Sequence, residues 1–184
     1  MVGLDEDEDV FAPIVQSTMR RSIWLGVNLV TAFIAVYFIG LFEATLQQKI
    51  ALAILMPVVA SMGGIAGTQT LIIVTRGIAT GRVTTANIKS LVNKEVAVSG
   101  LNGIIWSIVI ALATYYWFDD VVLSVVIGMA IIVNLAVAAF SGAFLPLLLT
   151  KLRIDPALAG GVILTTITDV IGFVAFLGLA ALVI

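Results

Sequence analysis

Five long apolar runs, separated by short polar segments, most constrain what this chain can fold into. The runs cover approximately residues 22–42, 50–74, 95–117, 121–149 and 156–184. A run of about 20 apolar residues is long enough to cross the hydrocarbon core of a bilayer as an α-helix. Because no water reaches the backbone there, a spanning segment must satisfy its own N–H and C=O groups, as a helix does. The runs therefore predict an all-α membrane protein with five transmembrane helices.

Composition places the chain in the same class. It is 61% hydrophobic and 11% charged, whereas a soluble domain is about half apolar and about a quarter charged. We therefore expect a multi-pass protein of the cell membrane, with residues 20–184 as the transmembrane domain in the lipid bilayer. Residues 1–19 are polar and acidic, and we interpret them as a cytoplasmic linker. No basic, aromatic surface suited to nucleic acid is present in the sequence.

The basic residues predict the orientation of the five spans. An odd number of spans puts the two termini on opposite sides of the membrane. Only Lys49 falls on one side, and eight basic residues fall on the other: Arg20, Arg21, Arg76, Arg82, Lys89, Lys94, Lys151 and Arg153. By the positive-inside rule, the N-terminus is expected in the cytoplasm and the C-terminus outside.

The absence of two residue types limits the chemistry. The chain contains no cysteine and no histidine, so thiolate and imidazole metal sites are excluded. Oxygen ligands favour hard cations such as Mg²⁺, Ca²⁺, Mn²⁺ or Na⁺ over Zn²⁺ or Cu⁺. No nucleophile–base pair, phosphate loop or cofactor motif is recognisable, so we do not expect an enzyme.

One acidic residue, Asp169, lies deep within an apolar run. At about 1.5 Å per residue it lies about 20 Å along the predicted helix from Pro156, near or past the middle of a hydrocarbon core about 30 Å thick. A charge there costs at least about 2.5–3.5 kcal/mol unless it faces a partner, water or an ion. No Lys or Arg lies at matching depth, so we interpret Asp169 as the ion-binding residue of a cation pathway. The alternative is a structural, protonated carboxyl that hydrogen-bonds to Asn134 or Asn102.

The last run also carries the residues that we expect to line this pathway. Gly161, Thr165 and Asp169 follow i, i+4, i+8 spacing and share one helix face, and Thr166 and Gly172 lie near it. One carboxylate is a poor site for a divalent cation. Two carboxylates related by a two-fold axis would match the charge of Mg²⁺, so a homodimer with this helix at the axis follows as a hypothesis.

Polar residues in the other runs allow two interpretations. The second run carries Pro57 and several glycines, which indicate either a close-packed helix or a locally weakened helix that lines a wet path. Its Gln69, together with Asn102 and Asn134 in later runs, is a candidate for the pathway. Intramembrane amides more often form hydrogen bonds between helices.

Acidic residues near the ends of the runs have simpler expected roles. Asp155 precedes Pro156, an arrangement typical of a helix N-cap, and a role as a ligand at the cytoplasmic mouth is the alternative. Glu95 is expected to pair with a nearby basic residue. Asp119 and Asp120 are expected to form a solvated outer turn.

Five segments can be compared with known families: Arg21 to Leu25, Leu41 to Glu43, Met56 to Thr70, Asp155 to Ala157 and Thr165 to Asp169. Together, in this order, they resemble the MgtE family of magnesium channels. The resemblance covers residues 10–184 approximately. It departs from the family at Gly64-Ile65-Ala66-Gly67, which is usually Gly-Asn-Ala-Gly, and at Gly160-Gly161, where the family usually has Ser followed by Pro or Asn.

The resemblance implies a homodimer of five-span subunits with a pore between the subunits. It places Asp169 in the pore, Thr165 and Gly161 one and two turns earlier, and Asp155 in cytoplasmic Mg²⁺ sensing. Family members usually also carry a cytoplasmic N domain and a CBS pair, so the chain looks like a transmembrane domain alone. The expected function is a channel that admits Mg²⁺, with Ca²⁺, Mn²⁺ or Co²⁺ as other possible ions. An H⁺- or Na⁺-coupled transporter and a non-transporting anchor domain are the alternatives.

Overall fold

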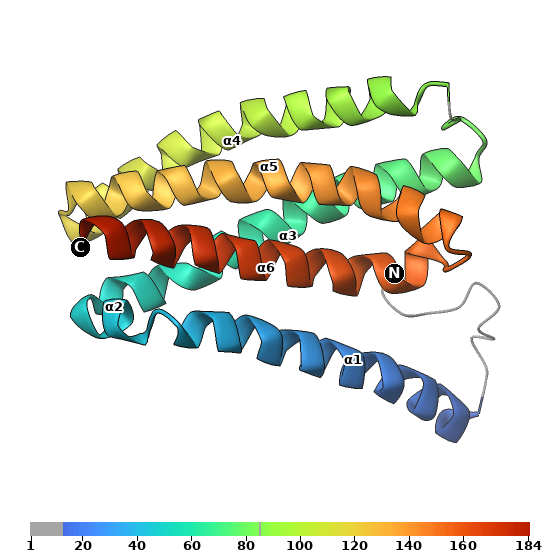
Figure 1. Ribbon diagram of the computed structural model, residues 1–184, viewed down its shortest axis with the longest axis horizontal. Coiled ribbons are helices and arrows are strands. Elements are labelled where there is room, and N and C mark those ends of the chain that lie inside the picture. Colours follow the sequence, from blue (N-terminus) through green and yellow to red (C-terminus); the bar gives the residue numbers. More distant parts are fainter. Residues whose placement is uncertain (1–12, 85) are drawn as a thin grey trace.

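The computed structural model describes residues 13–84 and 86–184, and in these ranges every regular element is a helix (Figure 1). Five of the helices are long and apolar enough to cross a membrane, which confirms the predicted fold class. The acidic cluster Asp5–Asp9 lies outside the described residues. The helices are α1 (Ile14–Gly40), α2 (Glu43–Gln48), α3 (Ile50–Ala79), α4 (Ile88–Phe118), α5 (Val121–Lys151) and α6 (Pro156–Val183).

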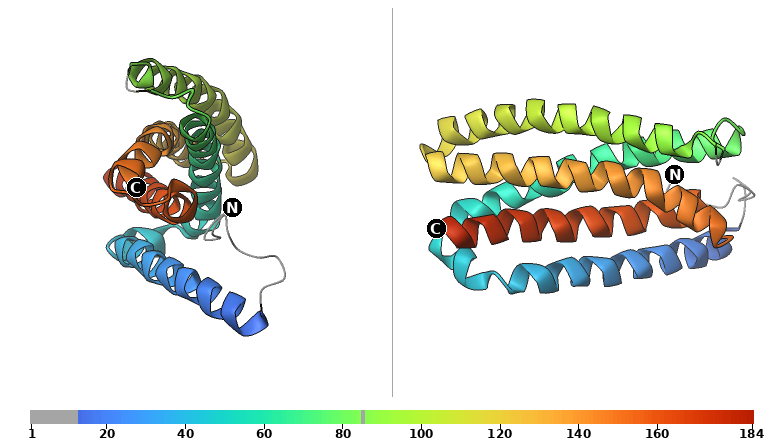
Figure 2. Two further views of the ribbon diagram at one scale, coloured as in Figure 1. Left: turned by 90° about the vertical axis from the view of Figure 1, so that its right-hand side faces the viewer. Right: turned by 45° about the horizontal axis from the view of Figure 1, so that its top comes forward.

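The long helices run roughly side by side, with α5 at the centre of the bundle. Helix α5 packs against α3, α4 and α6, while α1 packs against α6 at the opposite edge from α4 (Figures 1 and 2). The core between α3, α5 and α6 contains large apolar side chains that are fully buried, among them Leu52, Ile127 and Phe176. Helix α6 is therefore held from several sides.

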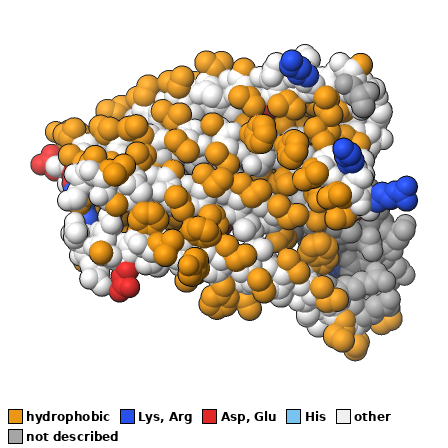
Figure 3. All heavy atoms as spheres, viewed as in Figure 1, with side chains coloured by type: hydrophobic (Ala, Val, Ile, Leu, Met, Phe, Trp, Pro, Cys, Tyr) orange, Lys and Arg blue, Asp and Glu red, His pale blue; other side chains and the backbone are white. Residues whose placement is uncertain are grey.

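The outer surface of the bundle is apolar as well (Figure 3). Large hydrophobic side chains are exposed along α1 and α4, including Phe33, Leu101 and Trp117. A soluble monomer rarely exposes a continuous apolar surface of this extent, whereas lipid tails solvate it at no cost. The exposed side chains and the five spans together show a multi-pass membrane protein.

Glycines bring α3, α5 and α6 into close contact. A Cβ added to Gly142 of α5 would lie 2.5 Å from the Gly67 carbonyl oxygen of α3, so the two backbones touch. Gly63 of α3 and Gly172 of α6 both face Asn134 of α5, which is fully buried and donates a 2.8 Å hydrogen bond to the Val59 carbonyl. Helix α3 is continuous past Pro57, and its Gly63 and Gly67 serve close packing, as small residues commonly do in membrane helices, whereas a Cβ at Gly64 would meet no atom within 4 Å.

Several helices are longer than the apolar runs that predict them. Helix α3 continues to Ala79 and α4 begins at Ile88, so both helices extend into the basic segment that separates the second and third apolar runs. The polar turn before α3 is the short helix α2. Helix α1 begins at Ile14, and the division at residues 19 and 20 stays a prediction. Hydropathy marks only the lipid-facing part of a helix, whereas backbone hydrogen bonds extend it into the polar layer.

Charged residues gather at the two ends of the bundle. In Figure 3 the visible Lys and Arg side chains lie mainly at one end, where α3 finishes and α4 and α6 begin, and the Asp and Glu side chains lie at the other. Lys49 belongs to the acidic end, where its ammonium group pairs with Asp120. This separation is the one on which the predicted orientation depends, and the orientation stays a prediction.

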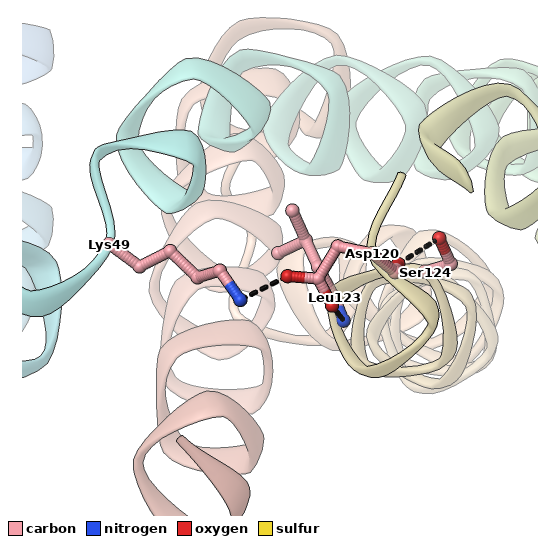
Figure 4. Close-up of polar contacts among 4 residues, drawn as sticks. All are labelled: Lys49, Asp120, Leu123 and Ser124. Atoms are coloured by element: carbon pink, nitrogen blue, oxygen red, sulfur yellow. Dashed lines mark hydrogen bonds and ion pairs between the residues drawn. The ribbon is translucent and has the colours of Figure 1, made fainter. Parts of the chain in front are cut away.

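Asp120 is a structural residue rather than part of a merely solvated turn. Its carboxylate accepts a 2.9 Å hydrogen bond from the Leu123 backbone N–H and so caps α5, and it also pairs with Lys49 ahead of α3 (Figure 4). Ser124 donates to the Asp120 carbonyl at 2.6 Å. The Leu123 N–H, and after it Lys49, hold the pKa of the Asp120 carboxyl below its usual 3.8.

We expect this contact to make stability depend on pH. Because the pKa of Asp120 is lower in the folded state, its contribution is fully present above pH 3.8 and is lost as the pH falls through the folded pKa. Asn is also a good N-cap, so Asp120→Asn should remove mainly the charge. It should lower stability at pH 7 by up to about 1 kcal/mol.

Thermal unfolding measured from pH 7 to pH 2 tests this prediction. The difference in melting temperature between the variant and the wild type should shrink as the pH falls. A difference that stays constant would contradict this account. Asp119→Asn at the exposed neighbour is the control.

Candidate functional site

An open groove of about 510 Å³ between α3 and α6 contains Asp169. Asp169 lies near the middle of α6, and its side chain is half-buried. Within the described residues, no hydrogen bond or ion pair holds this carboxylate. The groove is lined by Ala60, Ser61, Gly64, Ile65, Thr68, Gln69, Ile72, Thr165 and Asp169.

The helical repeat places the lining residues on one face of α3 and on one face of α6, and these two faces are turned toward each other. Ser61, Ile65, Thr68 and Ile72 recur at intervals of three or four residues, so they lie on one face of α3. Thr165 lies one turn before Asp169 and therefore on the same side of α6. The contact between α3 and α6 joins segments about a hundred residues apart in the sequence, and it brings the two lining faces together.

The hydroxyls of α6 are oriented by the helix itself. Thr165 donates to the carbonyl oxygens of Gly161 at 3.0 Å and Val162 at 3.1 Å, and Thr166 donates to Val162 at 2.7 Å. A hydroxyl that donates into its own helix keeps its oxygen lone pairs as acceptors. In the groove, Thr165 can therefore accept hydrogen bonds from water beside Asp169.

Other predicted pathway residues do not line the groove. Gly161 is buried, and Gly172 faces Asn134 and Val59 in the interior. Thr166 is half-buried but lies outside the groove. Helix α6 therefore contributes Thr165 and Asp169 to the lining.

The three candidate amide side chains lie in three different environments in the structure. Gln69 lines the groove with Asp169. Asn134 is fully buried, and its contact with Val59 favours the interhelical hydrogen bond over contact with water. Asn102 is exposed on α4, which packs mainly against α5. Sequence reasoning did not select Ala60 and Ile72 as lining residues, although their spacing from Gly64 and Thr68 on one helix face could have indicated them.

Two acids near the basic end behave as their sequence context predicts. Asp155 is the N-cap of α6, and its Oδ1 accepts a 2.8 Å hydrogen bond from the Ala157 backbone N–H. Its side chain is exposed, so its second carboxylate oxygen faces outward. Glu95 is buried, and its carboxylate lies 3.9 Å from the Lys94 ammonium group, which confirms the predicted pairing.

Comparison with known proteins identifies the family. The sequence model of the MgtE family, described as a divalent cation transporter, matches residues 56–179, which include the whole groove. The chain belongs to the MgtE family. It is 34% identical over 161 residues to the magnesium transporter MgtE of Bacillus subtilis, a match that covers 88% of this chain and 36% of the relative.

Two further MgtE relatives extend the match to almost the whole chain. The magnesium transporter MgtE of Thermus thermophilus is 30% identical over 166 residues, 90% of this chain and 37% of the relative. That of Enterococcus faecalis is 27% identical over 182 residues, 99% of this chain and 40% of the relative. The chain thus spans well under half the length of these relatives.

Proposed function

We propose that the chain conducts Mg²⁺ across the membrane and that Asp169 is the residue that binds the ion. The observation that supports this most is a carboxylate halfway along a membrane-spanning helix, in an otherwise uncharged groove, with no partner in the part of the chain that the structure describes. Such a residue is expensive in lipid, and in known proteins it marks an ion path. The names of the MgtE relatives, all magnesium transporters, suggest the ion.

The groove of one protomer is half of the proposed site. Among the described residues, no three acids lie close enough together to hold a metal ion, and Asp169 is the one acid of the groove. The groove is open on the surface of the protomer, so a second copy can cover it. A homodimer with α6 at a two-fold axis would bring two Asp169 carboxylates together, and the cation would relieve their mutual repulsion.

The other polar groups of the groove suit a hydrated ion. Mg²⁺ gives up its water shell reluctantly and is often bound through its waters. Thr165, Ser61, Thr68 and Gln69 supply oxygen atoms that accept hydrogen bonds from such waters. Asp155 would meet the ion first at the mouth of α6, because its outward carboxylate oxygen is not used by the helix cap.

A channel mechanism needs no chemical coupling. Each elementary charge moved through the membrane potential gains about 2.3 kcal/mol per 100 mV, so a divalent cation gains about 4.6 kcal/mol. Among the described residues, Asp169 is the acid nearest the middle of a transmembrane helix, whereas Glu95 lies about two turns from the start of α4 beside Lys94. A carboxylate that binds a cation in one step can also carry a proton, so a coupled transporter is the second candidate.

Flux into liposomes tests this proposal. The chain is reconstituted with a Mg²⁺-sensitive dye inside, and a K⁺ diffusion potential is set with valinomycin. We expect Mg²⁺ uptake to rise with an inside-negative potential and to proceed without an H⁺ or Na⁺ gradient. Uptake that requires either gradient would replace the channel with a coupled transporter. No uptake under any condition, from a folded and correctly inserted protein, would leave the anchor function.

A further inference from the structure

A second cavity lies at the basic end of the bundle, away from Asp169. It has a volume of about 570 Å³ and is bordered by the end of α3, the beginning of α4 and, from the connection between them, Thr80, Arg82, Val83 and Asn87. Three basic residues line it, one from each of these segments: Arg76, Arg82 and Lys94. Among the described residues no acid lines it, so the cavity concentrates positive charge.

The loop that carries Arg82 is held in place by its own hydrogen bonds. Asn87 donates to the Arg82 carbonyl at 2.7 Å and accepts from the Thr84 N–H at 2.8 Å. The Arg82 N–H donates to the Gly77 carbonyl at 2.9 Å. These bonds bend the loop back over the end of α3, so Arg76 and Arg82 reach the cavity from two directions.

The charges of the cavity are available to a ligand. Among the described residues, neither Arg76 nor Arg82 forms an ion pair with a carboxylate. Lys94 lies near the buried Glu95, but its own side chain remains 71% exposed. Hydroxyl and amide donors stand beside the cations, and the beginning of α4 adds the positive end of a helix dipole. These donors are the Ser90 hydroxyl and the second amide hydrogen of Asn87, because the Thr80 hydroxyl already donates to the Arg76 carbonyl at 2.9 Å.

We propose that this cavity binds a phosphate group at the membrane surface. Guanidinium groups match the oxygen atoms of phosphate in geometry and charge, and they bind them in pairs of hydrogen bonds. The site lies outside the ion path and does not depend on the proposed conduction of Mg²⁺.

The position of the cavity favours a lipid headgroup as the source of the phosphate. Both bordering helices are long and apolar enough to cross a membrane, and the cavity lies at their basic ends, where the positive charges indicate that they leave the hydrocarbon layer. Ile73 and Leu91 line it beside the polar groups, and they can contact the glycerol and acyl portion of a lipid. Basic pockets between transmembrane helices commonly bind anionic headgroups.

Lipid and phosphate binding to charge-matched variants tests the proposal. Arg76→Gln with Arg82→Gln removes two charges from the cavity. Lys89→Gln with Lys151→Gln removes two exposed charges at the same end of the bundle that do not line it. Native mass spectrometry of the whole chain measures bound phosphatidylglycerol, with phosphatidylcholine as the neutral reference. Calorimetry in a zwitterionic detergent measures inorganic phosphate, and thermal unfolding confirms that each variant is folded.

The expected result is weaker binding of the phosphate-containing ligand by the Arg76→Gln, Arg82→Gln variant alone. Each basic residue near the surface contributes about fivefold to the affinity for an anionic headgroup, so the arginine pair should cost about 25-fold. Weaker phosphatidylglycerol binding in that variant alone supports the site with lipid as its source. Loss of inorganic phosphate binding alone supports the site with free phosphate as its source. An equal loss in both double variants would show diffuse surface attraction, and no loss in either would remove the site. Either result overturns the proposal.

Discussion

Asp169→Asn is expected to lower Mg²⁺ uptake by the chain more than about 30-fold. The substitution preserves the size of the side chain and removes the carboxylate from the groove. Truncating one partner of a desolvated charged contact typically costs about 2–5 kcal/mol, and 2 kcal/mol corresponds to about 30-fold in affinity or rate. Because no group among residues 13–84 and 86–184 pairs with Asp169, that energy would be available to the cation of the proposed pathway.

The measurement is initial uptake into liposomes at a fixed inside-negative potential, with Mg²⁺ binding to the purified protein as a second readout. Asp119→Asn is the matched control, since it also removes one carboxylate but from an exposed turn. Asp119 has φ 50°, in the left-handed region that Asn tolerates, so this variant should fold normally. If Asp169→Asn retains uptake at the level of Asp119→Asn, Asp169 is not the ion-binding residue.

Gly142→Ala is expected to give the largest loss of stability from adding a single methyl group. The new Cβ would lie 2.5 Å from the Gly67 carbonyl oxygen and 3.2 Å from the Leu71 backbone nitrogen. Both atoms belong to the backbone of α3, so no side chain can rotate away and the helices must separate. Overpacking of this kind costs about 1–3 kcal/mol, and each kcal/mol lowers the melting temperature by about 2–4 °C in a chain of this size.

Gly100→Ala is the control for the effect of alanine itself. Gly100 lies inside α4, and a Cβ there would meet no atom within 4 Å. Alanine is favoured over glycine in a helix interior by about 1 kcal/mol, so this variant should be unchanged or more stable. The comparison uses thermal unfolding in the same detergent. Equal melting temperatures for the two variants would show that α3 and α5 do not touch at Gly142.

The groove illustrates how far sequence reasoning reaches and where it stops. Asp169 could be selected from the sequence because a carboxylate in an apolar run is costly unless it faces a partner, water or an ion. Thr165 could be selected because i, i+4 spacing puts it beside Asp169 on the helix. Gly172 and Asn134 could not be assigned in the same way. Whether a small or polar residue faces a neighbour or a path depends on the rotation of each helix, and here both turn inward to pack against each other.

Asp120 and Arg82 show the same limit at the ends of the bundle. Hydropathy placed both outside the membrane. It carried no information that Asp120 would meet Lys49 across 71 positions of sequence, or that Asn87 would hold the loop so that Arg82 lines a cavity. Contacts of this kind depend on which helix ends lie together.

The sequence alone determined that this is a five-span helical membrane protein and that its deepest acid is Asp169. These properties follow from local rules, because the length of an apolar run and the cost of a charge in lipid do not depend on neighbouring helices. Only the tertiary structure decided that α3 supplies the other wall of the groove, that the glycines join α3 to α5, and that three basic residues share one cavity. The physical reason is that lipid solvates apolar helices equally well on every side, so close packing and hydrogen bonds between helices select their neighbours.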